Sequence, residues 1–268
     1  MPLVSLDDRK YLEKQYKDST NLQARASLHQ RFSVNKYGWQ SWVFDHFDLP
    51  AGCRILELGC GPGTLWLDNL SRIPASWEIL LSDFSAGMLA AARQNLSPHR
   101  QFQYKVIDAQ SIPIEDGYFD AVIANHMLYH VPNRPAALAE IRRVLKPAGR
   151  LYASTGGDQH LVEMAGLVGR FNHEVTSWGM DTNSFTLENG IAQLSPCFTE
   201  IKLYRYENCL EVTEVAPLVD YILSGRPRIQ PERQPEFRDF VAHELEAQGG
   251  SFHISIDCGL FVAVRKGE

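Results

Sequence analysis

Glycines and carboxylates stand where they could bind a nucleoside. The glycine-rich segment 59–63 (GCGPG) follows a short apolar run, and Asp83 and Asp108 each follow another. Glycine lets the backbone turn tightly and approach a ligand, and the start of the next helix presents unpaired N–H groups. A carboxylate at Asp83 can accept both hydroxyls of a ribose, and one at Asp108 can accept the exocyclic amine of adenine. Together, in this order, these features predict a nucleoside site.

Each feature also has an ordinary structural interpretation. A glycine turn can serve only to pack a strand against a helix, and either aspartate can be a helix N-cap or a solvated turn residue. Binding of NAD or FAD fits less well, because Thr64 stands where the dinucleotide pattern G-x-G-x-x-G has its last glycine. That alternative also gives Asp108 no role.

A second group of reactive residues lies in the segment 125–130 (NHMLYH). On a helical turn, His126 and His130 would share a face, with Tyr129 beside them. A histidine with a pKa near neutrality can act as a general base for an O–H or N–H nucleophile, so both are candidate catalytic residues. Packing or contact with a cofactor is the alternative, since an amine or a stabilised carbanion needs no base.

Alternating strands and helices position these residues. Strands are predicted at 54–58, 78–82, 103–107, 119–124 and 150–154, and helices from Thr64 onward, at 86–95 and at 135–145. Apolar strands separated by helices are typical of an α/β fold, with a doubly wound, mostly parallel sheet covered on both sides. Such sheets bind ligands outside the carboxyl ends of their strands, where the polar residues above fall.

The flanking regions follow less regular patterns. Charged and aromatic residues at helical spacing predict two or three helices within 7–48. After the alternating region, helices are predicted at 159–173, 215–224 and 232–248, and a strand at 200–206. The last strands are predicted within 251–264, with a turn at Cys258-Gly259.

Composition favours a cytoplasmic protein and argues against a nucleic-acid partner. The 268 residues carry a net charge of −6, which argues against a nucleic-acid partner. The N-terminal residues lack the features of a signal peptide, and no apolar run approaches the roughly 18 residues of a membrane-spanning helix. The five cysteines form neither a CxxC pair nor a zinc-binding spacing, so we expect reduced thiols and no metal.

From residue 55 to residue 154 the sequence resembles the class I S-adenosylmethionine-dependent methyltransferases. Within them it is similar to the branch that includes ubiquinone and menaquinone biosynthesis enzymes. The resemblance rests on the segments 55–63 (ILELGCGPG), 83–89 (DFSAGML), 108–113 (DAQSIP), 119–122 (FDAV), 128–131 (LYHV) and 143–151 (RVLKPAGRL). Ala148 is a mild departure, because the family usually has glycine there.

The resemblance implies a Rossmann-like sheet of seven strands, the last antiparallel and beside the fifth. It also implies one domain over 1–268, with an N-terminal helical lid (1–50), a cofactor-binding core (51–155) and substrate-side helices and final strands (156–268). The cofactor would be S-adenosylmethionine, leaving S-adenosylhomocysteine as product. The residues expected at the cofactor are Tyr16 from the lid, Glu57, Gly59, Cys60, Gly61, Asp83, Phe84, Met88, Asp108, Ala109 and Asn125.

The resemblance implies that different strand ends contact different parts of the cofactor. Glu57 and the turn backbone would hold its methionine portion, with Asn125 near the amine. Asp83 would hold the ribose, whereas the side chains of Phe84 and Met88 would flank the adenine. Asp108 and the Ala109 backbone would bind the adenine edge.

The leading hypothesis is transfer of a methyl group to an O, N or C atom of a small metabolite. Two alternatives remain open. The protein could bind S-adenosylmethionine without transferring its methyl group, in a cyclase or a regulatory role, or it could methylate RNA or protein.

Overall fold

The computed structural model describes residues 6–17, 20–97, 99–173, 184–225 and 229–267. Its centre is a seven-stranded sheet in the order β3-β2-β1-β4-β5-β7-β6. The strands are β1 (Arg54–Leu58), β2 (Glu78–Asp83), β3 (Phe102–Val106), β4 (Phe119–Asn125), β5 (Leu145–Gly156), β6 (Phe198–Val212) and β7 (Phe252–Arg265). The pairs among β1 to β5 are parallel, and β7 is antiparallel to both β5 and β6. This confirms the predicted doubly wound sheet, with its last strand antiparallel and beside the fifth.

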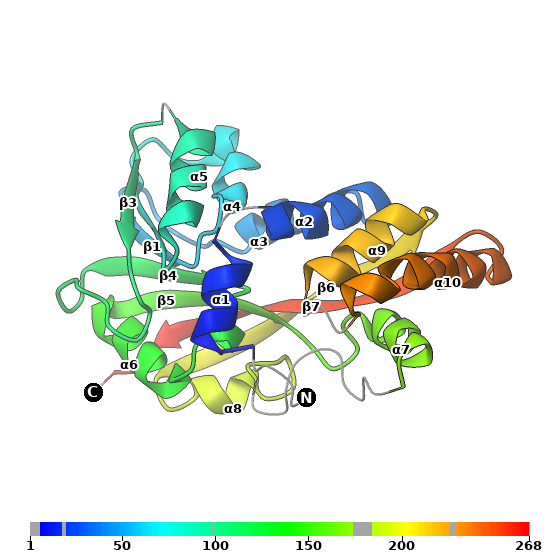
Figure 1. Cartoon of the computed structure of the whole chain (residues 1–268). Helices are drawn as coiled ribbons and strands as arrows, with labels where there is room; N and C mark the ends of the chain where they lie inside the picture. Colours follow the sequence, from blue (N-terminus) through cyan, green and yellow to red (C-terminus); the bar gives the residue numbers. More distant parts are fainter. Residues whose placement is uncertain (1–5, 18–19, 98, 174–183, 226–228, 268) are drawn as a thin grey trace.

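Helices cover both faces of the sheet (Figure 1). Alternate residues of a strand point to opposite faces, so Ile55 packs in the core beneath α3 (Trp39–Asp45), α4 (Thr64–Leu67) and α5 (Ala86–Leu96). Leu56 and Leu58 pack in the opposite core, which includes residues of α6 (Arg134–Val144) and α8 (Gly190–Leu194). Burial on both faces explains why the central strands are continuous apolar runs.

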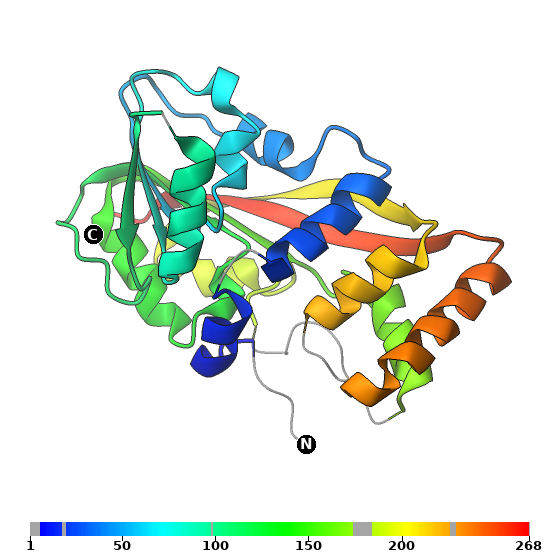
Figure 2. The ribbon, with the colours of Figure 1, turned by 45° about the horizontal axis from the view of Figure 1, so that its top comes forward.

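A two-stranded extension of the sheet forms a third core. The strands β6 and β7 are longer than β1 to β4, and their far halves pack against α2 (Thr20–Phe32), α7 (Val162–Phe171), α9 (Val215–Ser224) and α10 (Gln234–Ala247). Figure 2 shows α2 and α9 side by side on this extension, with α1 (Arg9–Gln15) near the end of α2. The N-terminal region therefore contains three described helices, as predicted.

The predicted turn at Cys258-Gly259 is wrong. Both residues lie inside β7, where Cys258 pairs with Tyr206 of β6 and with Gly156 of β5. A β-carbon added at Gly259 would lie 2.6 Å from the carbonyl oxygen of Tyr204. Glycine therefore allows a close approach between two strands here, and no change of direction is needed.

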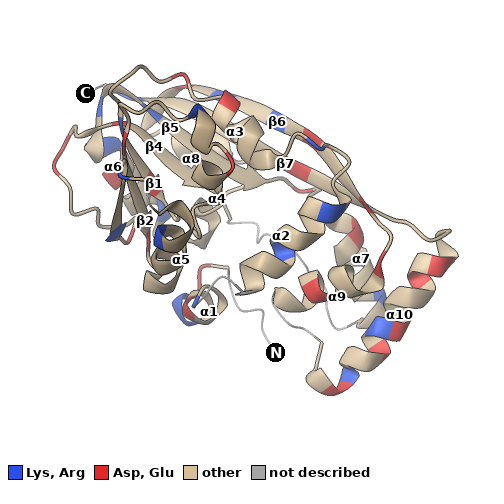
Figure 3. Cartoon of the chain, turned by 90° about the horizontal axis from the view of Figure 1, so that it is seen from above, with Lys and Arg blue, Asp and Glu red and all other residues tan. Residues whose placement is uncertain are grey.

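The outer surface carries charges of both signs, which Figure 3 shows along α10. Within the described part of the chain, no helix is both long and apolar enough to cross a membrane. Three short 3₁₀ helices complete the described elements: η1 (Leu70–Arg72), η2 (Leu128–His130) and η3 (Pro231–Arg233).

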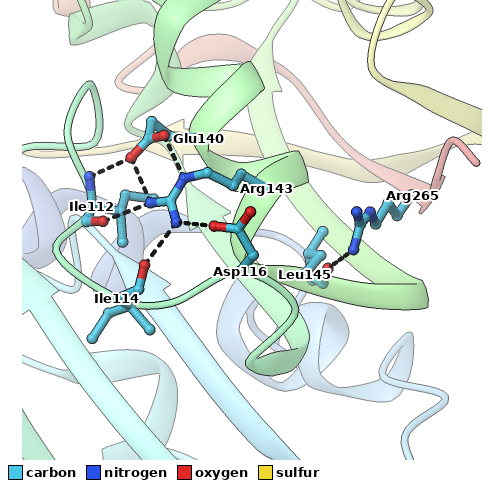
Figure 4. A network of polar contacts seen from close by, with 7 residues as sticks. All are labelled: Ile112, Ile114, Asp116, Glu140, Arg143, Leu145 and Arg265. Atoms are coloured by element: carbon cyan, nitrogen blue, oxygen red, sulfur yellow. Dashed lines mark hydrogen bonds and ion pairs between the residues drawn. The ribbon is translucent and has the colours of Figure 1, made fainter. Parts of the chain in front are cut away.

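Arg143 of α6 fastens the loop that follows β3. Its guanidinium donates hydrogen bonds of 2.8 Å to the carbonyl oxygens of Ile112 and Ile114, and it forms ion pairs with Glu140 and Asp116 (Figure 4). Glu140 in turn accepts a hydrogen bond from the backbone of Ile112. This network holds the end of the loop 107–118, which carries Asp108 at its start.

Candidate cofactor and acceptor site

The strand ends that carry the predicted residues meet at one edge of the sheet. The register pairs Leu58 of β1 with Ser82 of β2, and Asp83 with Val106 of β3. On the other side of β1, Asn125 of β4 pairs with Ser154 of β5. The structure therefore gathers at one edge the segments that carry the acidic, glycine and histidine candidates.

The glycine turn after β1 needs glycine for conformation and for space. Gly59, Gly61 and Gly63 have φ angles of 68°, 53° and 77°, in the left-handed region that L side chains disfavour. A β-carbon on Gly59 would also lie 2.8 Å from Cβ of Met127. Between the glycines, the backbone N–H of Cys60 bonds to the carbonyl of Ser82 at 2.9 Å. The turn is thus fixed against β2, and α4 begins directly after it.

Glu57 is a buried carboxylate with few hydrogen bonds to compensate for its removal from water. Its side chain accepts a 2.6 Å hydrogen bond at Oε2 from the indole N–H of Trp66, and the residue is 2% exposed. Among the described residues, no hydrogen bond reaches Oε1 and no cation pairs with the group. Burial raises the pKa of Glu57 to about 8, a rise that the Trp66 bond opposes and the nearby Asp83 increases. A ligand with a positive charge or strong hydrogen-bond donors would relieve this site.

Asp83 stands beside Glu57 at the end of β2. Its Oδ2 accepts the N–H of Gly61 at 3.0 Å, and its Oδ1 accepts the N–H of Ser85 at 2.8 Å. Burial raises the pKa of Asp83, and the backbone N–H bonds partly offset that rise. The carboxylate therefore joins the glycine turn to the start of α5, although no described cation balances its charge.

Asp108 differs from the other two carboxylates because its side chain is 44% exposed. Its Oδ1 accepts the backbone N–H of Gln110 at 3.0 Å and the Gln110 amide at 2.9 Å. Ala109, beside it, is buried. The N–H of Ile107 donates a hydrogen bond to the carbonyl oxygen of Asp83, so the loop that follows β3 begins beside the loop that follows β2. The role of Asp108 and Ala109 at adenine stays a prediction.

Phe84 and Met88 occupy different environments, although both were predicted to flank the adenine. Phe84 is 37% exposed at the edge of the sheet, and its ring meets the edge of Tyr16 at 6.5 Å between centroids. Met88, on the first turn of α5, is 1% exposed. Phe84 therefore offers an accessible aromatic face, whereas Met88 supports the site from within the core.

Asn125 at the end of β4 is held by three neighbours. Its Oδ1 accepts bonds from the hydroxyl of Ser154 and, at 3.2 Å, from the indole N–H of Trp39, and its amide donates to Gln40 at 3.3 Å. The side chain thus ties β4 to β5 and α3. Its predicted position near the methionine amine stays a prediction.

Tyr16 and His130 form a hydrogen-bonded pair. The Tyr16 hydroxyl lies 2.8 Å from Nε2 of His130, and Nδ1 of the same ring lies 2.9 Å from the carbonyl oxygen of Leu6. Because a carbonyl only accepts, Nδ1 carries the proton of the neutral ring and Nε2 accepts from the Tyr16 hydroxyl. Tyr16 follows directly after α1, and its own carbonyl accepts the Ser85 hydroxyl. The pair therefore joins the N-terminal helix to the strand ends.

The prediction that His126 and His130 share one helical turn is wrong. His126 has a φ angle of 52°, so it precedes the helical turn, whereas His130 ends η2. A left-handed φ angle is uncommon for a residue other than glycine, although histidine adopts it more often than most residues do. Both rings nevertheless contact Tyr129, at centroid distances of 6.4 and 4.4 Å.

His126 is half-buried and uncharged near neutral pH. Burial lowers its pKa to about 4, with smaller contributions from His29 and His130. Its ring packs against Trp39 at 4.9 Å, and no hydrogen bond to its ring nitrogens is found among the described residues. A neutral imidazole with unbonded nitrogens can accept a hydrogen bond from a ligand, but a pKa of about 4 makes this ring a weak base.

Sequence patterns missed several residues of this site. They are Arg25 and His29 from α2, Gln40 from α3, Ser154 from β5 and His160 from the segment that follows β5. Ser154 had a usable signal, since it ends a predicted strand as Asp83 and Asn125 do. The α2 residues belong to no motif, and only the packing of α2 against α9 brings them near the strand ends.

Comparisons with known proteins agree with this arrangement. A family described as "Methyltransferase domain" matches residues 56–153, from β1 into β5. The ubiquinone/menaquinone biosynthesis C-methyltransferase UbiE of Paraburkholderia phymatum is 33% identical over 114 residues, covering 42% of this chain and 47% of that protein. Residues 56–153 of this chain therefore form a methyltransferase domain similar to that of the UbiE enzymes. The chain spans less than half the length of several curated relatives that it matches.

Solved structures share the fold of the methyltransferase domain and its flanking regions. Phosphoethanolamine N-methyltransferase 2 of Haemonchus contortus, in complex with S-adenosyl-L-methionine, is 18% identical with a TM-score of 0.59, covering 99% of this chain and 61% of that one. The [4+2]-cyclase SpnF is 16% identical with a TM-score of 0.60, covering 100% of this chain and 99% of that one. At these identities the likeness concerns the fold alone.

Proposed function

We propose that this protein transfers a methyl group from S-adenosylmethionine to an O, N or C atom of a small-molecule acceptor. The observation that carries the proposal is the pair of buried carboxylates, Glu57 and Asp83, beside a glycine turn and without a described cation. The cofactor suits such a pair because it brings an ammonium, a sulfonium and two ribose hydroxyls. When bound, it supplies an electrophilic methyl group on a positively charged sulfur.

Each end of the cofactor has a proposed partner. Glu57 holds the ammonium, together with the turn backbone at Gly59, Cys60 and Gly61, and Asn125 lies near it. Asp83 accepts the ribose hydroxyls. The adenine lies against Phe84, supported by Met88, and its edge meets Asp108 and the Ala109 backbone.

The acceptor side is assigned to the residues after β4 and α1. His126, neutral and with unbonded ring nitrogens among the described residues, is the group best placed to accept a hydrogen bond from the acceptor, although its lowered pKa makes it a weak general base. His130 cannot do so directly while its Nε2 accepts the Tyr16 hydroxyl. We therefore assign His130 the role of orienting Tyr16, whose hydroxyl can contact the acceptor and whose ring contacts Phe84 on the cofactor side.

The class of acceptor rests on the relatives. Several are named as enzymes of quinone biosynthesis, among them a 2-phytyl-1,4-naphtoquinone methyltransferase of Thermosynechococcus vestitus that is 32% identical over 112 residues. They support a small molecule over RNA or protein, as does the mixture of charges on the surface. The five free cysteines fit a cytoplasmic location.

Two measurements test the proposal. Calorimetric titration with S-adenosylhomocysteine should show binding to the wild type, and Asp83→Asn should weaken it by about 2 kcal/mol, roughly 30-fold. Asp239→Asn, at an exposed position of α10, is the matched control and should bind like the wild type. Unchanged affinity in Asp83→Asn would refute the assignment of the ribose.

The second measurement separates transfer from mere binding, which the shared fold of a cyclase makes necessary. The wild type is incubated with S-adenosylmethionine and a panel of phenols, quinols, amines and carbon acids. Mass spectrometry then follows S-adenosylhomocysteine and a mass gain of one methyl group. Formation of both with one acceptor supports transfer, whereas conversion of an acceptor without either product supports the alternative.

A further inference from the structure

Arg25 of α2 is a half-buried cation near the acceptor side. Its Nη2 donates a 3.1 Å hydrogen bond to the carbonyl oxygen of Ser224, the last residue of α9, and its Nε lies 3.3 Å from the Ser224 hydroxyl. A cation beside the last carbonyls of a helix is a familiar stabilising arrangement. It uses part of the guanidinium only, since the group offers five N–H donors in a planar fork.

The charge of Arg25 lacks an acidic partner within the described part of the chain. Arginines at the surface do pair with carboxylates, as Arg31 of the same helix does with Glu214 and Arg72 with Asp45. Around Arg25, by contrast, the titratable neighbours are tyrosines: Tyr16, Tyr221, Tyr11 and Tyr129. Phenol groups are neutral near pH 7, so they can donate or accept hydrogen bonds but cannot balance the charge.

The histidines nearby are neutral as well. Burial lowers the pKa of His29 and His126 to about 4 and that of His160 to about 3. Burial also raises the pKa of Cys258, whose sulfur lies 3.5 Å from Nδ1 of His160, so this thiol is not an anion. The described cluster therefore keeps the single positive charge of Arg25. A half-buried charge without a counter-ion carries a desolvation cost, and an anionic ligand would relieve that cost.

Tyr16 connects this cluster to the cofactor side. Its ring contacts Phe84, and both Asp83 and Arg25 act electrostatically on its hydroxyl. Tyr16 thus stands between two regions of opposite charge. Glu57 and Asp83 suit the positive end of the cofactor, and Arg25 suits a negative group on a second ligand that lies across Tyr16.

We propose that Arg25 binds an anionic oxygen group of the methyl acceptor: a carboxylate, a phosphate or an ionised hydroxyl. The inference rests on the proposed function, because it names the class of acceptor for the same site. The fork of the guanidinium matches the two oxygens of a carboxylate or phosphate, and the tyrosine hydroxyls around it supply further donors. Neutral acceptors of the same shape would leave the charge of Arg25 unpaired.

The test uses the full chain saturated with S-adenosylhomocysteine and three probes of similar size: benzoate, phenyl phosphate and neutral benzamide. Calorimetry should show that at least one anion binds to the wild type, and that benzamide does so at least about tenfold more weakly. Arg25→Gln should remove the preference for the anion. Arg31→Gln, the same change on the outer side of the same helix, should keep it.

A second variant, Arg25→Lys, tests the same proposal even if Arg25→Gln does not fold. Lysine keeps the positive charge but lacks the planar set of N–H donors of a guanidinium. The affinity for the anion should therefore fall roughly three- to tenfold, while the affinity for S-adenosylhomocysteine stays the same. Equal binding of anions and benzamide to the wild type, or unchanged anion binding in both Arg25 variants, would overturn the proposal. Failure of S-adenosylhomocysteine to bind the wild type would instead refute the proposed function.

Discussion

Binding of the cofactor should expel a proton from Glu57. In the free protein burial raises the pKa of this carboxyl to about 8, so it is mostly protonated at pH 7. The ammonium of the cofactor favours the ionised form, and the proton must therefore leave as the ligand binds. The perturbation is the substitution Glu57→Gln, which keeps the shape of the side chain and the bond from Trp66 but has no proton to release.

The magnitude follows from the pKa. With a value of about 8, roughly 0.9 of a proton leaves per molecule bound at pH 7. Between pH 6 and pH 7 the affinity of the wild type should rise roughly ninefold, or about 1.3 kcal/mol. This range lies below the pKa of an ordinary α-amine, so the charge of the ligand changes little across it.

Calorimetry measures both quantities. Titrations with S-adenosylhomocysteine at pH 7 in buffers of different ionisation enthalpy give the number of protons released, and titrations at pH 6 and 7 give the change in affinity. Glu57→Gln should bind more weakly, without proton release and with nearly constant affinity. If the wild type releases no proton and binds equally at both pH values, Glu57 does not hold the ammonium.

Four further predictions follow from the same geometry. Because burial in the fold raises the pKa of Glu57 from 4.5 to about 8, its contribution to stability is full below pH 4.5 and is lost as pH rises through 8. Denaturant unfolding of the ligand-free proteins should therefore show that the free energy of unfolding of Glu57→Gln rises relative to that of the wild type between pH 5 and 9. The relative rise should be at most about 4–5 kcal/mol. Gly59→Ala, with its β-carbon against Met127 and a positive φ, should destabilise the protein by about 1–3 kcal/mol and abolish cofactor binding; a normal melting temperature with full binding would contradict this. Tyr16→Phe should reduce the rate of methyl transfer at least about tenfold and leave the Kd for S-adenosylhomocysteine within about twofold, as steady-state kinetics and calorimetry would show. Arg143→Met should lower the free energy of unfolding by about 1–3 kcal/mol, because it leaves the Ile112 and Ile114 carbonyls without their donor.

The sequence was most informative where a motif and a strand end coincide. Apolar runs flanked by glycine or aspartate located β1 to β4 to within one residue at either end, and the carboxylates that follow them fall at one edge. The strand ends meet because parallel strands in register bring their carboxyl ends together, so order along the chain was enough to predict proximity. The burial of Glu57 and the exposure of Asp108 depend on neighbouring loops and could not be predicted from the order alone.

Residues whose position depends on long-range packing escaped prediction. Arg25 and His29 lie on a helix without a motif, and their place is set by contacts with α9, nearly 200 residues later. The φ angle of His126 likewise has no local signal, since histidine is usually helical or extended. The prediction divided the continuous strand β7 because the local sequence Cys258-Gly259 is typical of a turn. The glycine is instead needed because a side chain there would clash with the neighbouring strand.

The insertion of β7 between β5 and β6 has a consequence for how the chain folds. Every other neighbouring pair in the sheet is complete before residue 252 is made, but β5 and β6 each lack their partner until then. During synthesis on the ribosome, the edge of β5 and the long inner edge of β6 remain open for pairing with other chains. We therefore expect this protein to need protection from aggregation until β7 has been made, and to close the sheet in one slow step.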